Sequence, residues 1–264
     1  MCKKLIYLTA FALVLGFRLT SLASAANIIL VTETRDKDEN GIQDDQGTID
    51  WLLAEGHNVN VQMDNWKDLD DANTPAKLAE LNKADLVIVS RACSSGSFDD
   101  GNEPANWDAI TAPLITLNAY LPRQKRLKWV ESNSCQSVDD ILMAADASHP
   151  IFDGVELIDG MMVIAYDNTV GAGTTTFLAT TDLGNGTLIA QTLGDGYTAI
   201  AEWEAGVEMY PGLGYVAGGP RLLFAAGTQE IDGPPPTTWG EHNLTAEGNQ
   251  MLRNAISYMA SAGQ

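Results

Sequence analysis

Residues 84–98, ADLVIVSRACSSGSF, decide the fold. They contain the apolar run 86–89, which is bounded by polar residues and is too short for a helix. Such a run is typical of a strand that is buried on both faces of a parallel sheet. A polar loop, 91–97, follows at once. Because ligands of open α/β sheets bind where the parallel strands end, this loop is the first place to look for a functional site.

Strand and helix patterns alternate on both sides of this run. We expect helices where apolar residues recur at helical spacing, and strands where short apolar runs stand between turn residues. The predicted strands are 27–32, 58–62, 113–117 and 127–130, and the predicted helices are 45–55, 75–83 and 107–110, with Ile49, Leu52 and Leu53 on the apolar face of the first. This order indicates an α/β fold with a doubly wound, mostly parallel sheet and helices on both faces.

The second half of the chain has a different pattern. Strand-like segments follow one another there, at 177–180, 188–193 and 199–204, with a hairpin turn at Gly194-Asp195-Gly196 between the last two. We therefore expect an added β-hairpin region. A last core strand at 221–226 and a helix at 245–260, capped by Asn243 or Thr245, complete a single domain over residues 26–264.

The first 25 residues have the pattern of an export signal. Lys3 and Lys4 precede the apolar run 5–15, and Ala23-Ser24-Ala25 offers a small-residue cleavage site. The apolar run is shorter than the roughly 20 residues that a membrane span needs. We therefore expect cleavage after Ala25, export to the periplasm or the extracellular space, and no membrane insertion of the cleaved protein.

The chain is strongly acidic, with a formal net charge of −20. Loss of residues 1–25 removes three basic residues and leaves −23. A field of this sign repels nucleic acid and anionic membranes, so we expect neither as a partner. It attracts divalent cations, and it also keeps a protein soluble in a saline environment. The sequence carries no signal for an oligomeric state.

Two cysteines, Cys93 and Cys135, remain after cleavage. Two cysteines in an exported chain more often pair than react, so we expect a Cys93–Cys135 disulfide. Closing a loop of that length would stabilise the fold by roughly 4 kcal/mol on the chain-entropy model.

Residues 36–44, DKDENGIQD, resemble the start of a calcium-binding loop. Oxygen-bearing side chains stand at alternate positions and a glycine stands at the bend, as a hard cation requires. The predicted Ca²⁺ ligands are Asp36, Asp38, Asn40, Ile42 and Asp44. The alternative is a solvated acidic loop in which Asp44 or Asp45 caps the following helix.

Polar side chains follow several of the predicted parallel strands. We expect them to meet at the carboxyl edge of the sheet and to bind a small polar ligand there. A guanidinium at this edge can form paired hydrogen bonds with a carboxylate or with two sugar hydroxyls. Alternatively, Arg91 pairs with Glu33 or Asp99 and only ties the loops together. The candidate ligand-binding residues are Glu33, Arg91, Ser94, Ser95, Asn118, Tyr120 and Arg123.

An ordered set of segments resembles a known family. The segments are NIILVTE, DQGTIDWLLAEGHNV, ADLVIVS, APLITLNAYL, HPIFDGV, AIAEWEAG, RLLFAAG and NLTAEGNQMLRNAISYM. Together they resemble the ThuA-like branch of the class I glutamine amidotransferase-like superfamily. The resemblance implies a flavodoxin-like fold, and the association of ThuA-like proteins with sugar metabolism implies a carbohydrate-type ligand.

The resemblance does not extend to the reactive residues. Catalytic members of the superfamily place a cysteine after the strand that matches 113–117, whereas this chain has Asn118-Ala119 there. We therefore expect a non-catalytic binding protein. One alternative is a hydrolase in which Cys93 or Ser95 of the 91–97 loop is activated by His242 with Glu241. Another is a calcium-stabilised structural or interaction module without a small-molecule site.

Overall fold

The computed structural model describes residues 25–231 and 238–263, so all of the predicted export signal except Ala25 lies outside the described residues. The strands are β1 Asn27–Thr32, β2 Asn58–Met63, β3 Leu86–Val89, β4 Leu114–Thr116, β5 Cys135–Val138, β6 Leu142–Ala144, β7 Met162–Val163, β8 Thr175–Leu178, β9 Thr187–Thr192, β10 Thr198–Trp203 and β11 Arg221–Phe224. The α-helices are α1 Gln46–Ala54, α2 Thr74–Leu81, α3 Glu103–Asp108 and α4 Ala246–Ala262, and single 3-10 turns lie at Asp64–Trp66, Ser95–Ser97 and Pro150–Phe152.

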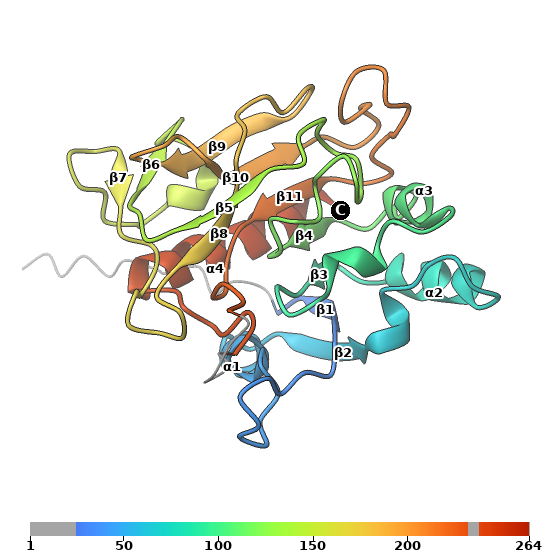
Figure 1. Ribbon diagram of the computed structural model, residues 1–264. Coiled ribbons are helices and arrows are strands. Elements are labelled where there is room, and N and C mark those ends of the chain that lie inside the picture. Colours follow the sequence, from blue (N-terminus) through green and yellow to red (C-terminus); the bar gives the residue numbers. More distant parts are fainter. Residues whose placement is uncertain (1–24, 232–237, 264) are drawn as a thin grey trace, which may run out of the picture.

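The 11 strands of the described residues belong to one mixed sheet (Figure 1). Its order is β2-β1-β3-β4-β11-β10-β9-β6-β7, with β8 paired to β10 and β5 paired to β8. Strands β2, β1, β3, β4 and β11 run parallel to one another. Every residue of β3 and β4 is buried, as the apolar run 86–89 predicted. The carboxyl ends of β1, β3 and β4 therefore meet at one edge of the sheet, which we call the carboxyl edge.

The other half of the sheet is antiparallel, so the prediction of a mostly parallel sheet is wrong. Strand β10 pairs antiparallel with both β9 and β11, and β6 pairs antiparallel with β9 and β7. The reason is the short link between β9 and β10, because a parallel pair needs a crossover of a dozen or more residues. The predicted hairpin turn is present there, with Gly196 at φ +70° and Thr192 N donating to Tyr197 O over 2.8 Å.

The predicted strand at 127–130 is also wrong, because this segment forms turns. Its apolar residues are buried as side chains of a loop that packs on the sheet, with Trp129 against Trp203 at 5.3 Å between ring centroids. Lys128 has φ +61°, which breaks any extended strand. Apolar composition thus indicated burial correctly and secondary structure incorrectly.

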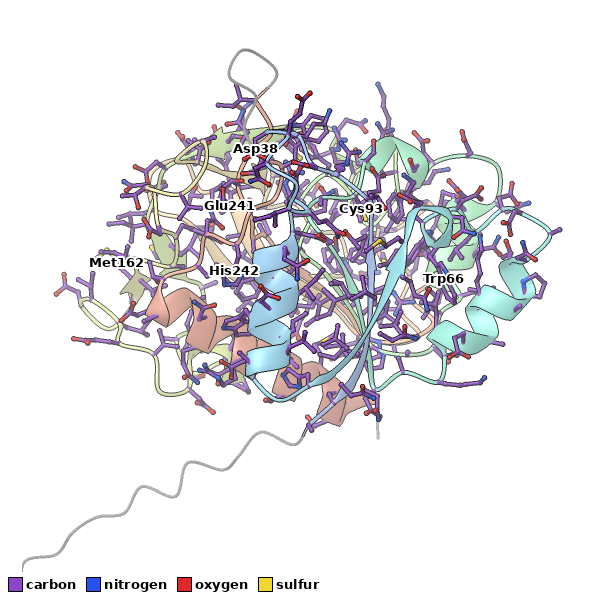
Figure 2. The ribbon with its side chains drawn as sticks, turned by 90° about the horizontal axis from the view of Figure 1, so that it is seen from below. Asp38, Trp66, Cys93, Met162, Glu241 and His242 are labelled. Atoms are coloured by element: carbon purple, nitrogen blue, oxygen red, sulfur yellow. The ribbon has the colours of Figure 1, made fainter. Side chains whose placement is uncertain are left out.

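The helices cover both faces of the parallel strands (Figures 1 and 2). Helices α1 and α4 lie side by side, where Arg253 Nη2 donates to Glu55 Oε1 over 2.7 Å. Helix α3 lies beside the segment that leads into α2, where Trp107 Nε1 donates to Lys67 O over 3.1 Å. Leu53 is 51 % exposed on α1, so it does not belong to the predicted apolar face.

Helix α4 follows its prediction closely. Thr245 is its N-cap residue, and its hydroxyl accepts a hydrogen bond from Gly248 N over 3.1 Å. Its predicted apolar residues Leu252, Ile256 and Met259 are all buried. No helix in the described part of the chain is long and apolar enough to cross a membrane.

Candidate functional site

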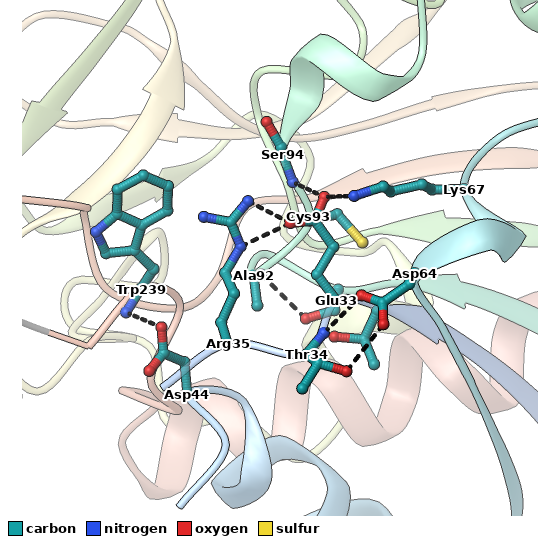
Figure 3. Close-up of polar contacts among 12 residues, drawn as sticks. Glu33, Thr34, Arg35, Asp44, Asp64, Lys67, Ala92, Cys93, Ser94 and Trp239 are labelled. Carbon is teal, nitrogen blue, oxygen red and sulfur yellow. Dashed lines mark hydrogen bonds and ion pairs between the residues drawn. The ribbon is translucent and has the colours of Figure 1, made fainter. Parts of the chain in front are cut away.

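Glu33 lies at the centre of the carboxyl edge, directly after β1 (Figure 3). Its carboxylate is buried and accepts hydrogen bonds from Ser94 N over 2.8 Å and from Arg35 Nε over 2.7 Å, and it pairs with Lys67. Burial alone would raise the pKa of Glu33, but the bonds from Lys67, Ser94 and Arg35 outweigh it and hold the pKa below its usual value. Glu33 therefore links the three loops that follow β1, β2 and β3.

A second buried carboxylate, Asp45, lies beneath the same edge. Its Oδ2 accepts hydrogen bonds from Ser90 Oγ over 2.7 Å and from the hydroxyl of Thr32. These two hydroxyls stand at the ends of β3 and β1, so Asp45 joins both strands to the start of α1. Sequence reasoning named Asp45 as a possible helix cap or as a further acid for the calcium loop. It is the N-cap residue, but its side chain bonds to the strand ends and makes no cap hydrogen bond.

Asn118 follows β4 at the position where the resemblance would place a catalytic cysteine. Its side chain is fully buried, and Nδ2 donates to Cys93 O over 2.8 Å while Oδ1 accepts from Tyr120 N over 3.0 Å. The amide thus holds the loop after β3 against the loop after β4. It faces its neighbours and is not presented to a ligand.

Arg91 is buried and pairs with Glu230, which follows β11. Neither Glu33 nor Asp99, the partners considered from the sequence, pairs with it. Its Nε has no hydrogen-bond partner in the described residues, and burial lowers the pKa of Arg91 to about 10. Arg91 does tie loops together, as the alternative had it, but through a residue 139 positions away in the chain.

The half-buried part of this edge is formed by Tyr120, Arg123, Arg126 and Ser95, which we call the arginine cluster. The guanidinium carbons of Arg123 and Arg91 lie 4.6 Å and 5.1 Å from the centroid of the Tyr120 ring. Arg123 Nη2 and Arg126 Nε each donate to Ser95 Oγ over 3.2 Å. Arg126 also pairs with Asp99. In the described part of the chain, Arg123 pairs with no carboxylate.

The predicted disulfide is absent, because Cys93 and Cys135 are both free. Cys93 Sγ lies 3.4 Å from Val31 O in β1, whereas Cys135 Sγ lies 3.3 Å from Ala119 O beyond β4. Strand β3 stands between β1 and β4, so the thiols point to different parts of the edge. Burial raises the pKa of Cys93 well above its usual value, with Glu33 and Asp45 adding to the effect, and burial raises the pKa of Cys135 to about 11.

The hydrolase alternative needs a base beside Cys93 or Ser95. His242 Nδ1 lies 3.3 Å from Thr48 Oγ1, and its Nε2 lies 2.8 Å from Asn249 Oδ1. Its ring stacks on Trp51 of α1, and Glu241 accepts a hydrogen bond from the Thr238 hydroxyl. Cys93 lies apart from His242 (Figure 2). Ser95 bonds to Arg123 and Arg126, so within the described residues the structure brings neither Cys93 nor Ser95 to His242.

The 36–44 loop brings its acids together. One carboxylate oxygen each from Asp36, Asp38 and Asp44 lies within 4.8 Å of the others. Asp36 Oδ2 accepts from Gly41 N over 2.8 Å, and Asn40 Oδ1 accepts from Ile42 N over 2.7 Å. Burial raises the pKa of Asp44, and the nearby Asp38 carboxylate adds to the rise.

Two cavities lie at the opposite, amino edge of the parallel strands. The larger has a volume of about 440 Å³, and the smaller lies between β10, the start of β11 and the end of α4. Sequence reasoning missed both, because no motif marks them. At the larger one, Lys128 Nζ bonds to Tyr215 OH over 2.8 Å, and burial raises the pKa of Asp108 to about 8. The larger cavity is lined by Ala105, Asp108, Ala109, Leu213, Gly214, Tyr215 and Val216.

Comparison with solved structures gives several matches. One of them is a crystal structure from Bacteroides uniformis that is provisionally described as a ThuA-like protein. The match covers 90 % of this chain and 93 % of that chain, with 9 % sequence identity and a TM-score of 0.47. No protein-family model matches this sequence, and no curated protein does.

Replacing Glu33 by glutamine tests its role as a bridge. Near pH 7 we expect the free energy of unfolding to fall by about 2 kcal/mol, because Arg35 and Lys67 lose a charged partner. The pKa of Glu33 in the folded protein lies below the ordinary 4.5. Its contribution is therefore complete above that value and is lost as the pH falls through the folded pKa. Urea unfolding near pH 7 and near pH 3 should show the two proteins converging in acid.

Glu80→Gln is the matched control for this measurement. The Glu80 side chain is 44 % exposed and pairs with Lys83 on the surface, so its replacement should cost less than about 0.5 kcal/mol at either pH. An equal loss for Glu33→Gln at both pH values would contradict the bridge.

The cysteines give a second test. Near pH 7 the folded protein should leave Cys93 and Cys135 unmodified by a thiol reagent, because burial keeps both thiols protonated. After unfolding in denaturant without reductant, both should react, as peptide mapping by mass spectrometry would show. Modification only after a reductant is added would reveal a disulfide and contradict the structure.

Proposed function

We propose that this chain is an exported, non-catalytic ThuA-like domain that binds a small polar ligand at the carboxyl edge. The first ligand class to test is a saccharide. The observation that carries the proposal is Arg123, a half-buried guanidinium that stacks on Tyr120 and pairs with no carboxylate in the described residues. A polar ligand with paired oxygens would complete its hydrogen bonds.

The order of the parallel strands supports the flavodoxin-like assignment. The order β2-β1-β3-β4-β11 corresponds to the 2-1-3-4-5 order of flavodoxin-like sheets, in which ligands bind at the carboxyl edge. The non-catalytic part rests on Asn118, whose side chain is used to hold the Cys93 carbonyl, and on the protonated state of Cys93. A buried, protonated thiol is a poor nucleophile.

A panel of neutral and acidic monosaccharides, followed by thermal unfolding, tests the binding site. At about 100 times Kd a ligand should stabilise the protein by about 2.7 kcal/mol and raise Tm by several degrees. Tyr120→Ala should abolish this rise, because it removes the ring on which Arg123 rests. Tyr215→Ala, at the larger amino-edge cavity, is the matched control and should leave the rise intact.

The reverse pattern would place the ligand in the amino-edge cavity and overturn the proposal. So would the lack of a rise with every sugar tested. Conversion of any bound sugar, detected by product analysis, would overturn the non-catalytic part alone.

We propose calcium binding by the 36–44 loop as a second function. The three converging carboxylates of Asp36, Asp38 and Asp44 support it, because a hard cation prefers such oxygens and would relieve their mutual repulsion. The proposed ligand set adds Asn40 and Ile42 to these acids. A structural role follows from the position of the loop between β1 and α1.

Calcium should raise Tm, and a chelator should reverse the rise. For a loop of this kind we expect Kd of about 10⁻⁴ to 10⁻³ M, so about ten times Kd should stabilise the fold by about 1.4 kcal/mol. Asp38→Asn should remove the effect. Glu39→Gln, an equal charge change at an exposed position of the same loop, should retain it. An equal loss in both variants would indicate general screening of charge and contradict a specific site.

A further inference from the structure

Together with the buried Arg91, the arginine cluster brings three guanidinium groups close together, and in the described residues two of them pair with a carboxylate. Arg91 pairs with Glu230 and Arg126 pairs with Asp99, which leaves Arg123 as the third cation. Arg123 is held by neutral oxygens, with Nε on Tyr120 O at 2.9 Å and Nη1 on Asn133 O at 3.4 Å. Burial lowers the pKa of Arg123, as expected for a cation that has lost water without gaining a full counter-charge.

Ser95 adds a hydrogen-bond donor at the same place. Its Oγ accepts one bond from Arg123 Nη2 and one from Arg126 Nε, which uses both oxygen lone pairs. In the described part of the chain, the hydroxyl proton has no acceptor, so it is available to an incoming oxygen. Two guanidinium groups and one hydroxyl thus converge on one spot between the loop after β3 and the loop after β4.

This concentration of cations stands out against the composition of the chain. Only 15 residues are basic and 35 are acidic, so an anion is repelled by most of the surface. A protein of this charge gains nothing in solubility from three neighbouring arginines. Paired, charge-assisted hydrogen bonds to an anion do use such an arrangement.

We infer that the ligand of the carboxyl edge carries an anionic group, a carboxylate or a phosphate, which lies against Arg123, Arg126 and the Ser95 hydroxyl. The inference rests on the proposed function and narrows it from polar ligands to acidic ones. A sugar acid or a sugar phosphate would satisfy it, whereas a neutral sugar would leave Arg123 without a counter-charge.

Calorimetric titration of the full chain with glucuronate, glucose, glucose 6-phosphate and inorganic phosphate tests the inference. We expect an acidic sugar to bind at least about tenfold more tightly than glucose, since charge-assisted bonds are about twice as strong as neutral ones. Glucuronate and glucose 6-phosphate distinguish a carboxylate from a phosphate as the preferred group. Inorganic phosphate shows whether the anion alone is sufficient.

Arg123→Gln should lower the affinity for the acidic sugar by about tenfold or more. Lys125→Gln makes the same charge change at an exposed residue of the same loop and should alter it less than about twofold. Arg123→Lys keeps the charge but loses the paired geometry, so it should fall between the two. Ser95→Ala, a change that removes only the hydroxyl, keeps the test valid if Arg123→Gln does not fold.

The outcomes separate the inference from the proposed function. Equal binding of glucose and the acidic sugars, lost in Tyr120→Ala, would overturn the inference and keep the binding function. Acid-selective binding that Arg123→Gln and Ser95→Ala leave unchanged would also overturn it. Binding of none of the four probes would overturn both.

Discussion

The carboxyl edge depends on one buried carboxylate, that of Glu33. The carboxyl ends of parallel strands lie at a common edge of the sheet, where three loops from distant parts of the sequence must pack together. Glu33 makes this possible because it takes hydrogen bonds from Arg35, Lys67 and the Ser94 main chain at once. A buried charge is tolerated only when such bonds offset the loss of water. Asp45 likewise holds the ends of β1 and β3 together, because it accepts hydrogen bonds from the hydroxyls of Thr32 and Ser90.

This arrangement also explains which residues are left for function. Three polar residues nearest the strand ends are buried, and the side chain of each bonds to a neighbouring loop: Glu33, Asn118 and Arg91. The groups further from the strand ends are half-buried and have hydrogen-bonding capacity left for a ligand: Ser95, Tyr120 and Arg123. The residues that hold the edge together and the residues that can meet a ligand are thus successive layers, with the first fixing the second in place.

The sequence predicted the elements whose character is local and missed the features that depend on distant neighbours. Apolar runs and capping residues located β1, β3 and α4 to within about two residues. The β9–β10 hairpin was predicted from its turn, but the extent of antiparallel pairing was not, because the pairing of β10 with β11 and of β6 with β9 and β7 joins segments that are distant in the sequence. The segment 127–130 has the apolar residues of a strand but buries them from a loop. The pairing of two cysteines in an expected exported chain favoured a disulfide, yet this rule carries no information on where the Cys93 and Cys135 side chains point.

The acidic loop and the carboxyl edge are physically connected. Asp44 Oδ2 accepts a hydrogen bond from Trp239 N over 3.1 Å, and the guanidinium carbon of Arg35 lies 4.5 Å from the centroid of the Trp239 ring (Figure 3). Arg35 is itself bound to Glu33. On the other side of Trp239, the main chain at Gly240 passes so close to Arg91 that an added Cβ would lie 3.0 Å from the Arg91 Cβ. If the 36–44 loop binds calcium as proposed, a cation on Asp44 would restrain Trp239 and, through it, Arg35 beside Glu33, because these residues form one continuous chain of contacts.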